Sequence, residues 1–570
     1  MEYSNTHPIN NDRRLIVGID FGTTYSGICW AQTERVDRHT SIDDWPSSRT
    51  NHGGHSSSKV PTKLRYLRNR QFEWGAQISH DVPAQEVLSL FKLGLEPDKY
   101  RNSVDIIGKA LTVDDVDQKI TDYLSGLFEH FMHVMRQKIG LTSLSSIPLQ
   151  FVLTVPAIWS DRAKQRTVEA FQRISNLPSG YSTTLLSEPE AAAIAALQEL
   201  NRHNMNIGDS FLVLDAGGGT VDLITYTITA LNPVVEVVEA TEGTGDFCGS
   251  SRVNDRFIQF ITSRLQHEEG WDEDVLHDAT KRRFTMSSLA QRETFSVPVP
   301  GLGLNRDLGV IRAGRFELRA EDLHMFFEPD IIRIIQLVKE QIALSNASIR
   351  SILLVGGYGS SMYLRERLGI AIQEDSSIRE NIEILQPPNA WLSVVQGAVM
   401  KGLSLAKPEN YDIPTVKARA ARKHYGYEVS AAYDDNRHAT LSSKRYYDGL
   451  DGIWRVAVME WFIKRGELVS EDVPFRKTFS IYHPVSYGRP RTETLRIYAD
   501  QTSTEAPLSR NNDVQTLCHV TANLDHIPEE ALDRRQGVDG RMYYELEFEI
   551  EAVYRSAATE YTLIHKGMFS

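Results

Sequence analysis

Two segments of this chain repeat one pattern, and the repetition constrains the fold more than any other feature. An apolar run ends in an aspartate, a turn of glycines and threonines follows, and a second apolar run leaves the turn; the segments span residues 15–27 and 211–226, with Asp20 and Asp215 at equivalent places. Each pattern predicts two strands joined by a turn. Glycine lets backbone N–H groups approach phosphate oxygens, and the neighbouring carboxylate can hold Mg²⁺ through water. Two copies favour a duplicated fold that holds one triphosphate from both sides.

Other interpretations of these turns explain less. A single glycine-rich turn is most often a hairpin whose glycines only satisfy a positive φ, but here both copies carry an aspartate and a threonine. The glycines lack the G-x-G-x-x-G spacing of a dinucleotide fold and lead into strands rather than a helix, and no Walker A sequence follows them. The pattern therefore predicts a nucleotide site of another kind.

Bulk properties exclude several classes of protein. With 570 residues the chain is long enough for roughly three to four domain-sized units, and 41% apolar with 24% charged residues is ordinary for a globular protein. A net charge of −13 argues against a partner that is nucleic acid or an anionic membrane. No apolar run reaches the ~20 residues of a transmembrane helix, and the polar start lacks the apolar segment of a signal peptide. Three distant cysteines predict neither disulfides nor a zinc site, so we expect a protein of the cytoplasm or nucleus.

The pattern of predicted secondary structure changes near residue 405. Residues 1–13 are predicted to be a disordered lead. Between them and residue 405, strands and helices alternate: the patterns predict strands at 149–156 and 351–355, and helices at 112–138, after Ser160, and at 190–200, 321–345 and 391–403. Pro329 is expected to divide the fourth of these helices into two. After residue 415 short β-rich stretches predominate, at 454–462, 478–482, 494–498 and 543–554. We therefore expect a β-rich domain over residues 415–570.

Five motifs in order resemble the 70-kDa heat-shock chaperone family, which belongs to the actin and sugar-kinase fold superfamily. They are the segments 20–26, 154–157, 187–193, 215–222 and 354–357. The resemblance implies an α/β, actin-like ATPase fold of two ribonuclease-H-like lobes over residues 14–405, with lobe I formed by 14–205 and 378–405 and lobe II by 206–377. It also implies ATP or ADP as ligand, with Mg²⁺.

The resemblance also implies roles for individual residues. The catalytic group would comprise Asp20, Lys92, Glu188, Asp215 and Asp222, with hydrated Mg²⁺ held by Asp20 and Asp215. The phosphates would be contacted by Gly22, Thr23, Thr24, Tyr25, Gly217, Gly218, Gly219 and Thr220. The adenosine would lie against Gly356, Gly357 and Tyr358, with a clamp formed by Asp278, Lys281 and Arg282. The alternative for the clamp segment is a charged, solvated helix face. The assignment of Lys92 rests on one short match.

Several positions depart from the family pattern. Tyr358 stands where the family has a small serine, so its ring either stacks on the base or narrows the pocket, and Asp278 stands where a glutamate is expected. No linker of an aspartate and leucines lies between residues 403 and 414, and neither a long helical lid nor an acidic Glu-Glu-Val-Asp tail follows the β-rich region. These departures resemble the divergent, lidless branch of the family, the twelfth-subfamily type of animals and its relatives in filamentous fungi.

Three classes of function follow. The first is an ATP-hydrolysing, chaperone-like protein whose β-rich domain binds an unfolded peptide or a specific protein client, with co-chaperones as further partners. The second is a nucleotide-gated scaffold with little turnover, favoured by the short match at Lys92. The third is a small-molecule kinase on the same fold, for which no sugar-binding motif is visible. A filament-forming, actin-like role is disfavoured by the large appended domain.

Overall fold

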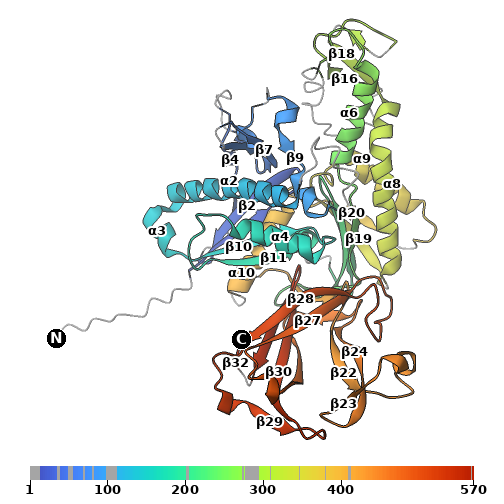
Figure 1. Ribbon diagram of the computed structural model, residues 1–570. Coiled ribbons are helices and arrows are strands. Elements are labelled where there is room, and N and C mark those ends of the chain that lie inside the picture. The colour runs from blue at the N-terminus through green and yellow to red at the C-terminus, as the bar shows by residue number, and fades with distance from the viewer. Residues whose placement is uncertain are drawn as a thin grey trace, which may run out of the picture. The chain divides into compact units, whose positions relative to one another are not determined.

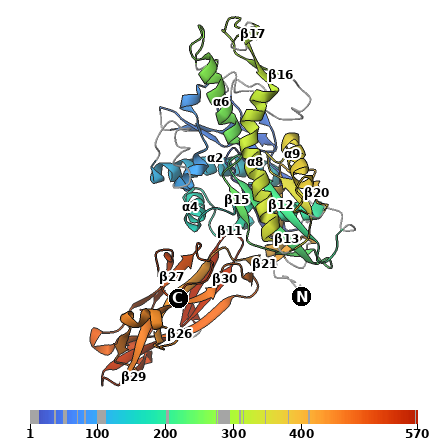
Figure 2. The same ribbon diagram turned by 90° about the vertical axis from the view of Figure 1, so that its right-hand side faces the viewer.

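The computed structural model of this chain contains two compact units, residues 1–415 and 416–570 (Figures 1 and 2). The structure describes residues 13–34, 39–48, 55–68, 71–79, 82–97, 112–199, 205–272, 275, 294–307, 310–312, 314–345, 347–378, 381–407, 412–565 and 568–569. All of the predicted disordered lead except Arg13 therefore lies outside the described residues, and so does the predicted adenine clamp.

A first sheet in unit 1 is built around the N-terminal copy of the repeated pattern. The central strand β1 (Leu15–Asp20) pairs antiparallel with β2 (Tyr25–Gln32) and parallel with β10 (Leu149–Val155). Strand β11 (Ser182–Ser187) continues the parallel side, and β3 (Thr40–Ser41) and β6 (Val60–Pro61) both pair antiparallel with β2. The pattern at residues 15–27 thus forms the two strands and turn that were predicted.

A second sheet in unit 1 repeats this order around the other copy. Strand β12 (Ser210–Ala216) pairs antiparallel with β13 (Val221–Ala230) and parallel with β19 (Ile349–Val355), which in turn pairs parallel with β20 (Glu383–Leu385). Strands β14 (Glu236–Glu239) and β15 (Thr244–Asp246) pair antiparallel with β13. Since both sheets place an Asp-ended strand between an antiparallel and a parallel neighbour, the predicted duplication is confirmed.

The first sheet is buried on both faces. Along β1, Leu15, Val17 and Ile19 belong to a core shared with α2 (Val113–Ile139) and α4 (Asp161–Gln172), and the intervening Ile16 belongs to a core shared with α10 (Ser393–Ala406). This alternation follows from the two-residue period of a strand. It explains why the strand is apolar along nearly its whole length, with helices on each side (Figure 1).

Two helices of unit 1 begin with a capping side chain. Thr112 forms a capping box with Asp115 at the start of α2, and the Ser160 hydroxyl accepts a hydrogen bond from the Ala163 N–H at the start of α4. The alanine-rich helix α5 (Glu188–Glu199) packs on α10 so closely that a Cβ at Gly397 would lie 1.8 Å from the Ala191 carbonyl oxygen. Small residues on both helices permit this approach.

The predicted break at Pro329 is wrong, because α8 (Ala320–Leu344) continues through the proline. The helix loses one backbone donor there, but a side chain from another helix binds groups on either side of the proline. Arg256 of α6 (Ser251–Leu265) donates to the Phe326 carbonyl (2.7 Å) and to the Asp330 carboxylate (3.0 Å). Figure 2 shows α6 and α8 side by side. Tertiary contacts thus outweigh the local preference of proline.

Shorter elements complete the described part of unit 1. They are β4 (Asp44–Trp45), β5 (His55–Ser56), β7 (Lys63–Tyr66), β8 (Phe72–Trp74), η1 (Gly75–Gln77), η2 (Ala84–Glu86), β9 (Leu88–Ser89), η3 (Phe91–Leu95), α3 (Leu141–Ser146), β16 (Thr294–Pro298), β17 (Val310–Arg312), β18 (Arg315–Arg319) and α9 (Met362–Gln373).

Unit 2 is a β-sandwich. One sheet has the order β23-β24-β22-β27-β28, and the other has β26-β30-β31-β32 with β29 beside β30. Along β30, Tyr544, Leu546, Phe548 and Ile550 face a core that also holds Tyr427 and Ile497 of the opposite sheet, while glutamates alternate with them. The described residues of this unit contain 3₁₀ turns and no α-helix.

The strands of unit 2 have the following bounds: β21 (Thr415–Ala420), β22 (His424–Ala432), β23 (Tyr446–Asp448), β24 (Ile453–Ile463), β25 (Leu468–Ser470), β26 (Phe475–Pro484), β27 (Thr492–Asp500), β28 (Gln515–Asn523), β29 (Asp533–Gln536), β30 (Met542–Tyr554), β31 (Thr559–His565) and β32 (Met568–Phe569). Strand β21 pairs with β25. In neither unit does a described helix combine the length and the apolar character needed to cross a bilayer.

Candidate functional site

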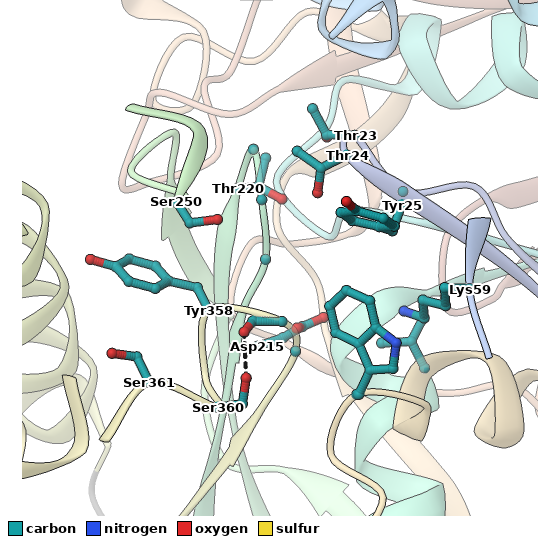
Figure 3. A pocket seen from close by; sticks show the side chains of 18 of the residues that line it. Thr23, Thr24, Tyr25, Lys59, Asp215, Thr220, Ser250, Tyr358, Ser360 and Ser361 are labelled. Atoms are coloured by element: carbon teal, nitrogen blue, oxygen red, sulfur yellow. Dashed lines mark hydrogen bonds between the residues drawn. The ribbon is translucent and has the colours of Figure 1, made fainter. Parts of the chain in front are cut away.

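The turns of both hairpins face one cavity of about 540 Å³ in unit 1. Fifteen of the residues predicted from the sequence line it: Asp20, Gly22, Thr23, Thr24, Tyr25, Lys92, Glu188, Asp215, Gly217, Gly218, Gly219, Thr220, Gly356, Gly357 and Tyr358. The predicted Asp222 lies beside them, paired in register with Asp215 across the second hairpin. Figure 3 shows Tyr25 and Lys59 on one side of the cavity, Tyr358 and Ser361 on the other, and Asp215 between.

The two turns touch each other. A Cβ at Gly218 would lie 2.2 Å from the Thr24 hydroxyl oxygen, and one at Gly219 would lie 2.5 Å from the Thr23 hydroxyl oxygen. Only glycine permits this approach of the second turn to the first. Within the described part of the chain, the N–H groups of Gly218 and Gly219 have no hydrogen-bond partner, as a phosphate cradle requires.

The segment that leads into α6 fixes the second turn from behind. Ser251 N–H donates to the Gly218 carbonyl (2.9 Å), and Ser250 N–H donates to the Gly217 carbonyl (3.2 Å). The turn's carbonyls are therefore used in its own support, and the positive end of α6 lies next to the cavity, where it favours an anion.

Buried carboxylates gather behind the turns. Burial, followed by repulsion from Glu188, Asp222 and Asp20, raises the pKa of Asp215 well above its usual range. Burial likewise raises the pKa of Asp222, against the lowering effect of a hydrogen bond from the Ile158 N–H (3.1 Å). Gly356, with φ of +82°, passes so close to Asp215 that a Cβ there would lie 2.4 Å from its Oδ1.

This carboxylate cluster fits a hydrated divalent cation better than a directly bound one. Positive charge would relieve the repulsion from neighbouring carboxylates that, after burial, helps to raise the pKa of Asp215. Among the described residues, no group of three or more His, Cys, Asp or Glu side chains is arranged to bind a metal directly. A Mg²⁺ ion with most of its water shell, held with nucleotide phosphates, is the form that this donor set suits.

Lys92 lies at the inner end of the cavity. It belongs to η3, which follows Leu90 with a positive φ of +59°. Its Nζ donates to Glu188 Oε1 (2.9 Å) and lies 4.9 Å from the centre of the Trp159 ring. Burial raises the pKa of Glu188 to about 7, although the neighbouring ammonium of Lys92 acts in the opposite direction.

Sequence reasoning missed Lys59 and Trp391. Lys59 Nζ donates to Asp20 Oδ2 (2.6 Å), and both side chains are buried. The ammonium also lies 4.8 Å from the centre of the Trp391 ring, which in turn contacts Tyr25 at 5.5 Å between ring centres. Neither residue belongs to a recognisable motif. Lys59 follows a run of three serines, so its surroundings in the sequence gave no signal.

The side of the cavity assigned to adenosine is formed by the turn after β19. The Ser360 hydroxyl donates to the Gly357 carbonyl (2.7 Å), and Gly357 lies against Trp391. The ring of Tyr358 is only 4% exposed and belongs to the core with Phe327, while its hydroxyl is buried without a hydrogen-bond partner in the described structure. Most of this ring therefore faces the core. The predicted clamp residues Asp278, Lys281 and Arg282 lie outside the described residues.

Comparison with known proteins shows what this chain is similar to. Residues 115–368 match the family model described as Hsp70 protein. The chain is 21% identical to heat shock 70 kDa protein 12A of Mus musculus over 513 residues, which covers 74% of this chain and 73% of that protein. It is 22% identical to heat shock 70 kDa protein 12B of Homo sapiens over 74% of this chain and 72% of that protein.

A bacterial relative matches a similar share of the chain. Over 398 residues, the chain is 25% identical to a protein of Rickettsia rickettsii named chaperone protein HscA homolog, covering 70% of this chain and 58% of that protein. These matches confirm the resemblance stated from the sequence motifs. Residues 115–368 match the Hsp70 family model, the fold is the actin-like ATPase fold, and the chain is similar to the divergent 12-type branch of that family.

Proposed function

We propose that this chain binds ATP at the cavity of unit 1, hydrolyses it slowly, and uses the nucleotide state to control binding of a client by unit 2. The observation that carries the proposal is the convergence of two Asp-Gly turns on one cavity of about 540 Å³. A triphosphate needs several N–H donors and a charge-neutralising partner. The N–H groups of Gly218 and Gly219, unpaired within the described residues, supply donors, and the buried carboxylates would hold the Mg²⁺ that neutralises the phosphate charge.

Each group in the cavity has a chemical role in this proposal. The turns bind and orient the phosphates, and Asp20 with Asp215 would hold the water shell of Mg²⁺, which neutralises charge that develops on the transferred phosphoryl group. Asp215 or Asp222 would orient the attacking water through a carboxylate oxygen. Glu188 holds Lys92 by the 2.9 Å bond, which places its ammonium inside the cavity.

Hydrolysis would change the contact between the two sheets of unit 1. The Thr23 and Thr24 turn belongs to the first sheet, and the Gly218 and Gly219 turn to the second. A γ-phosphate held by both turns links the sheets, and its loss removes one link. We propose that unit 2 responds by changing its affinity for an unfolded peptide or a specific protein client, with co-chaperones as further partners.

A nucleotide-gated scaffold with little turnover is the second candidate, and the Lys59–Asp20 ion pair favours it. At 2.6 Å the ammonium engages one of the two carboxylates assigned to the metal. A carboxylate that is already neutralised attracts a divalent cation less strongly, so hydrolysis would be slow while nucleotide binding is retained.

Single-turnover hydrolysis of Mg²⁺-ATP decides between the two candidates. We expect ADP formation by the wild type and a loss of about 100-fold or more in Asp215→Asn, the scale for removal of one preorganised electrostatic group. Asp114→Asn, an exposed position in the first turn of α2, is the matched control and retains the wild-type rate. If all three proteins bind ATP and none of them forms ADP, the ATPase is rejected and the scaffold is supported.

The proposed coupling needs its own measurement. A panel of fluorescent peptides is titrated with the full chain in ATP and in ADP, together with Asp215→Asn held in ATP. Different peptide affinities in the two nucleotides support coupling, with Asp215→Asn retaining the ATP value over time. Equal affinities in all conditions contradict it.

A further inference from the structure

The ammonium of Lys59 lies buried in the cavity, and the proposed hydrolysis assigns it no role. Its side chain is 8% exposed, and that of its partner Asp20 is 6% exposed. Burial of a lysine ammonium costs free energy, because the charge leaves water. The Trp391 ring, 4.8 Å from Nζ, adds a cation–π contact on a further side.

The surrounding backbone makes room for this side chain. Gly27 lies opposite Asp20 in the register of the first hairpin, and a Cβ there would lie 3.1 Å from Lys59 Cγ. Strand β6, which begins at the next residue, pairs Val60 with Ser26. The stem of Lys59 therefore lies over the hairpin at Gly27, where no side chain blocks it, and the ammonium reaches Asp20 at the end of β1.

The charge balance of the cavity depends on this residue. Lys92 and Lys59 line the cavity together with the carboxylates of Asp20, Glu188 and Asp215. Lys92 is paired with Glu188, whereas Lys59 is paired with Asp20, the aspartate that leads into the first turn. Lys59 is therefore the lysine that lies beside this turn. It also lowers the pKa of Asp215, although burial and the other carboxylates raise that pKa by more. Without Lys59, a polyanion at this turn would meet the unpaired charge of Asp20.

We propose that Lys59 is a fixed cation of the nucleotide site, which neutralises Asp20 and attracts the phosphates, so that nucleotide binding depends only weakly on Mg²⁺. The inference rests on the proposed binding of nucleotide and does not require hydrolysis. Lys59 is a binding residue in this account, and Trp391 and Gly27 are the positioning residues that hold it.

Affinity for a fluorescent ADP, measured in Mg²⁺ and in EDTA, tests this directly. For the wild type, we expect the two dissociation constants to agree within about threefold. For Lys59→Met, the constant in EDTA should be at least about 30-fold weaker than in Mg²⁺, at the lower end of the cost of truncating one member of a buried charge pair. Lys138→Met, an exposed lysine in the last turn of α2, is the control and behaves as wild type.

A second pair of variants removes the risk that Lys59→Met fails to fold around an unpaired carboxylate. Asp20→Asn leaves the ammonium free to contact phosphate, and the double variant Asp20→Asn with Lys59→Met lacks both charges. In EDTA, Asp20→Asn should bind the nucleotide at least about tenfold more tightly than the double variant, a difference of one charge-assisted contact. Thermal melts establish that both are folded.

Each outcome has one meaning. Equal affinities of Asp20→Asn and the double variant in EDTA overturn the inference, as does wild-type binding that EDTA weakens by 30-fold or more. Wild-type binding that is independent of Mg²⁺ and unchanged in Lys59→Met also overturns it, because the charge then comes from elsewhere. All three leave the proposed nucleotide binding intact. Failure of the wild type to bind any nucleotide, with or without Mg²⁺, rejects the proposed function itself.

Discussion

The two hairpins of unit 1 share a backbone plan and differ in charge. In each, a buried strand ends in an aspartate, and the returning strand pairs antiparallel with it. Asp20 of the first hairpin is held by Lys59 at 2.6 Å. Asp215 of the second forms no ion pair in the described part of the chain, and its pKa is raised well above the usual range, first by burial and then by repulsion from other carboxylates.

This difference arises outside the repeated pattern. Strand, aspartate and turn are encoded within about a dozen consecutive residues of each copy, so their backbone plan is local. The neutralising lysine comes from a segment 39 positions later in the chain, brought in by pairing of β6 with β2. Duplication thus preserves the geometry of a site, whereas its electrostatics are set by the segments that pack on each copy.

Removing the cation should have the largest effect. Lys59→Met leaves Asp20 buried and unpaired, so we expect the ligand-free protein to lose about 3 kcal/mol or more in free energy of unfolding of unit 1. Chemical denaturation followed by tryptophan fluorescence measures this loss, with Lys138→Met as the control. A loss below about 1 kcal/mol would show that the pair is solvated, and the two hairpins would then be electrostatically alike.

Adding a methyl group to the second turn tests its contact with the first. Gly218→Ala places a Cβ 2.2 Å from the Thr24 hydroxyl oxygen, and we expect a loss of about 1–3 kcal/mol in stability. Thr24→Ala removes the clashing oxygen and should restore part of that loss. Gly303→Ala is the matched control, since nothing lies within 4 Å of a Cβ at that position. Equal melting temperatures for the two single glycine variants would refute the contact.

Neutralising Asp215 should raise the free energy of unfolding, whereas removing the cation that pairs with Asp20 should lower it. The raised pKa of Asp215 means that its charged form is disfavoured in the folded state. We therefore expect Asp215→Asn to stabilise the ligand-free protein, and urea titrations measure the gain. Asp114→Asn should change nothing, and a destabilised Asp215→Asn would contradict the stated asymmetry.

The pH dependence of stability should show the smallest effect. Glu188 has a pKa of about 7 in the folded protein against 4.5 ordinarily. Because the folded state binds this proton more tightly, the stability that the group contributes is complete below about pH 4.5 and is lost as pH rises through 7. We expect ligand-free unit 1 to be roughly 1 kcal/mol more stable at pH 6 than at pH 8 from this group.

A double variant isolates that pH effect. Lys92→Met with Glu188→Gln removes both members of the buried pair, so neither is left uncompensated. The difference in stability between pH 6 and pH 8 should shrink by roughly 1 kcal/mol in urea titrations compared with wild type. An unchanged difference would mean that Glu188 is charged throughout this range.

Local sequence predicted much of the fold. Strand periodicity, the helix start at Ser160 and the repeated hairpins lie within short windows, and the structure contains each of them. The prediction at Pro329 was wrong because the support for its helix comes from Arg256, 73 positions earlier in the chain, whose role no local pattern reveals.

The site could be predicted only as far as its motifs reach. The glycine turns and their aspartates were found because backbone approach to phosphate demands glycine at fixed spacing. Lys92 was proposed from a short match, and the structure places its ammonium 2.9 Å from Glu188. Lys59 and Trp391 were missed because a single lysine or tryptophan carries no spacing signal. The place of Lys59 in the site depends on the pairing of β6 with β2, and that of Trp391 depends on its contact with Gly357.

The contact between the two turns also restricts how this sequence can change. Gly218 abuts Thr24, and Gly219 abuts Thr23, so a larger residue at one position requires a smaller one at its partner nearly 200 positions away. A library that randomises one turn while fixing the other would contain few folded proteins. Productive variation, whether in a laboratory or in a lineage, has to pass through paired substitutions, so these four positions should covary as two couples.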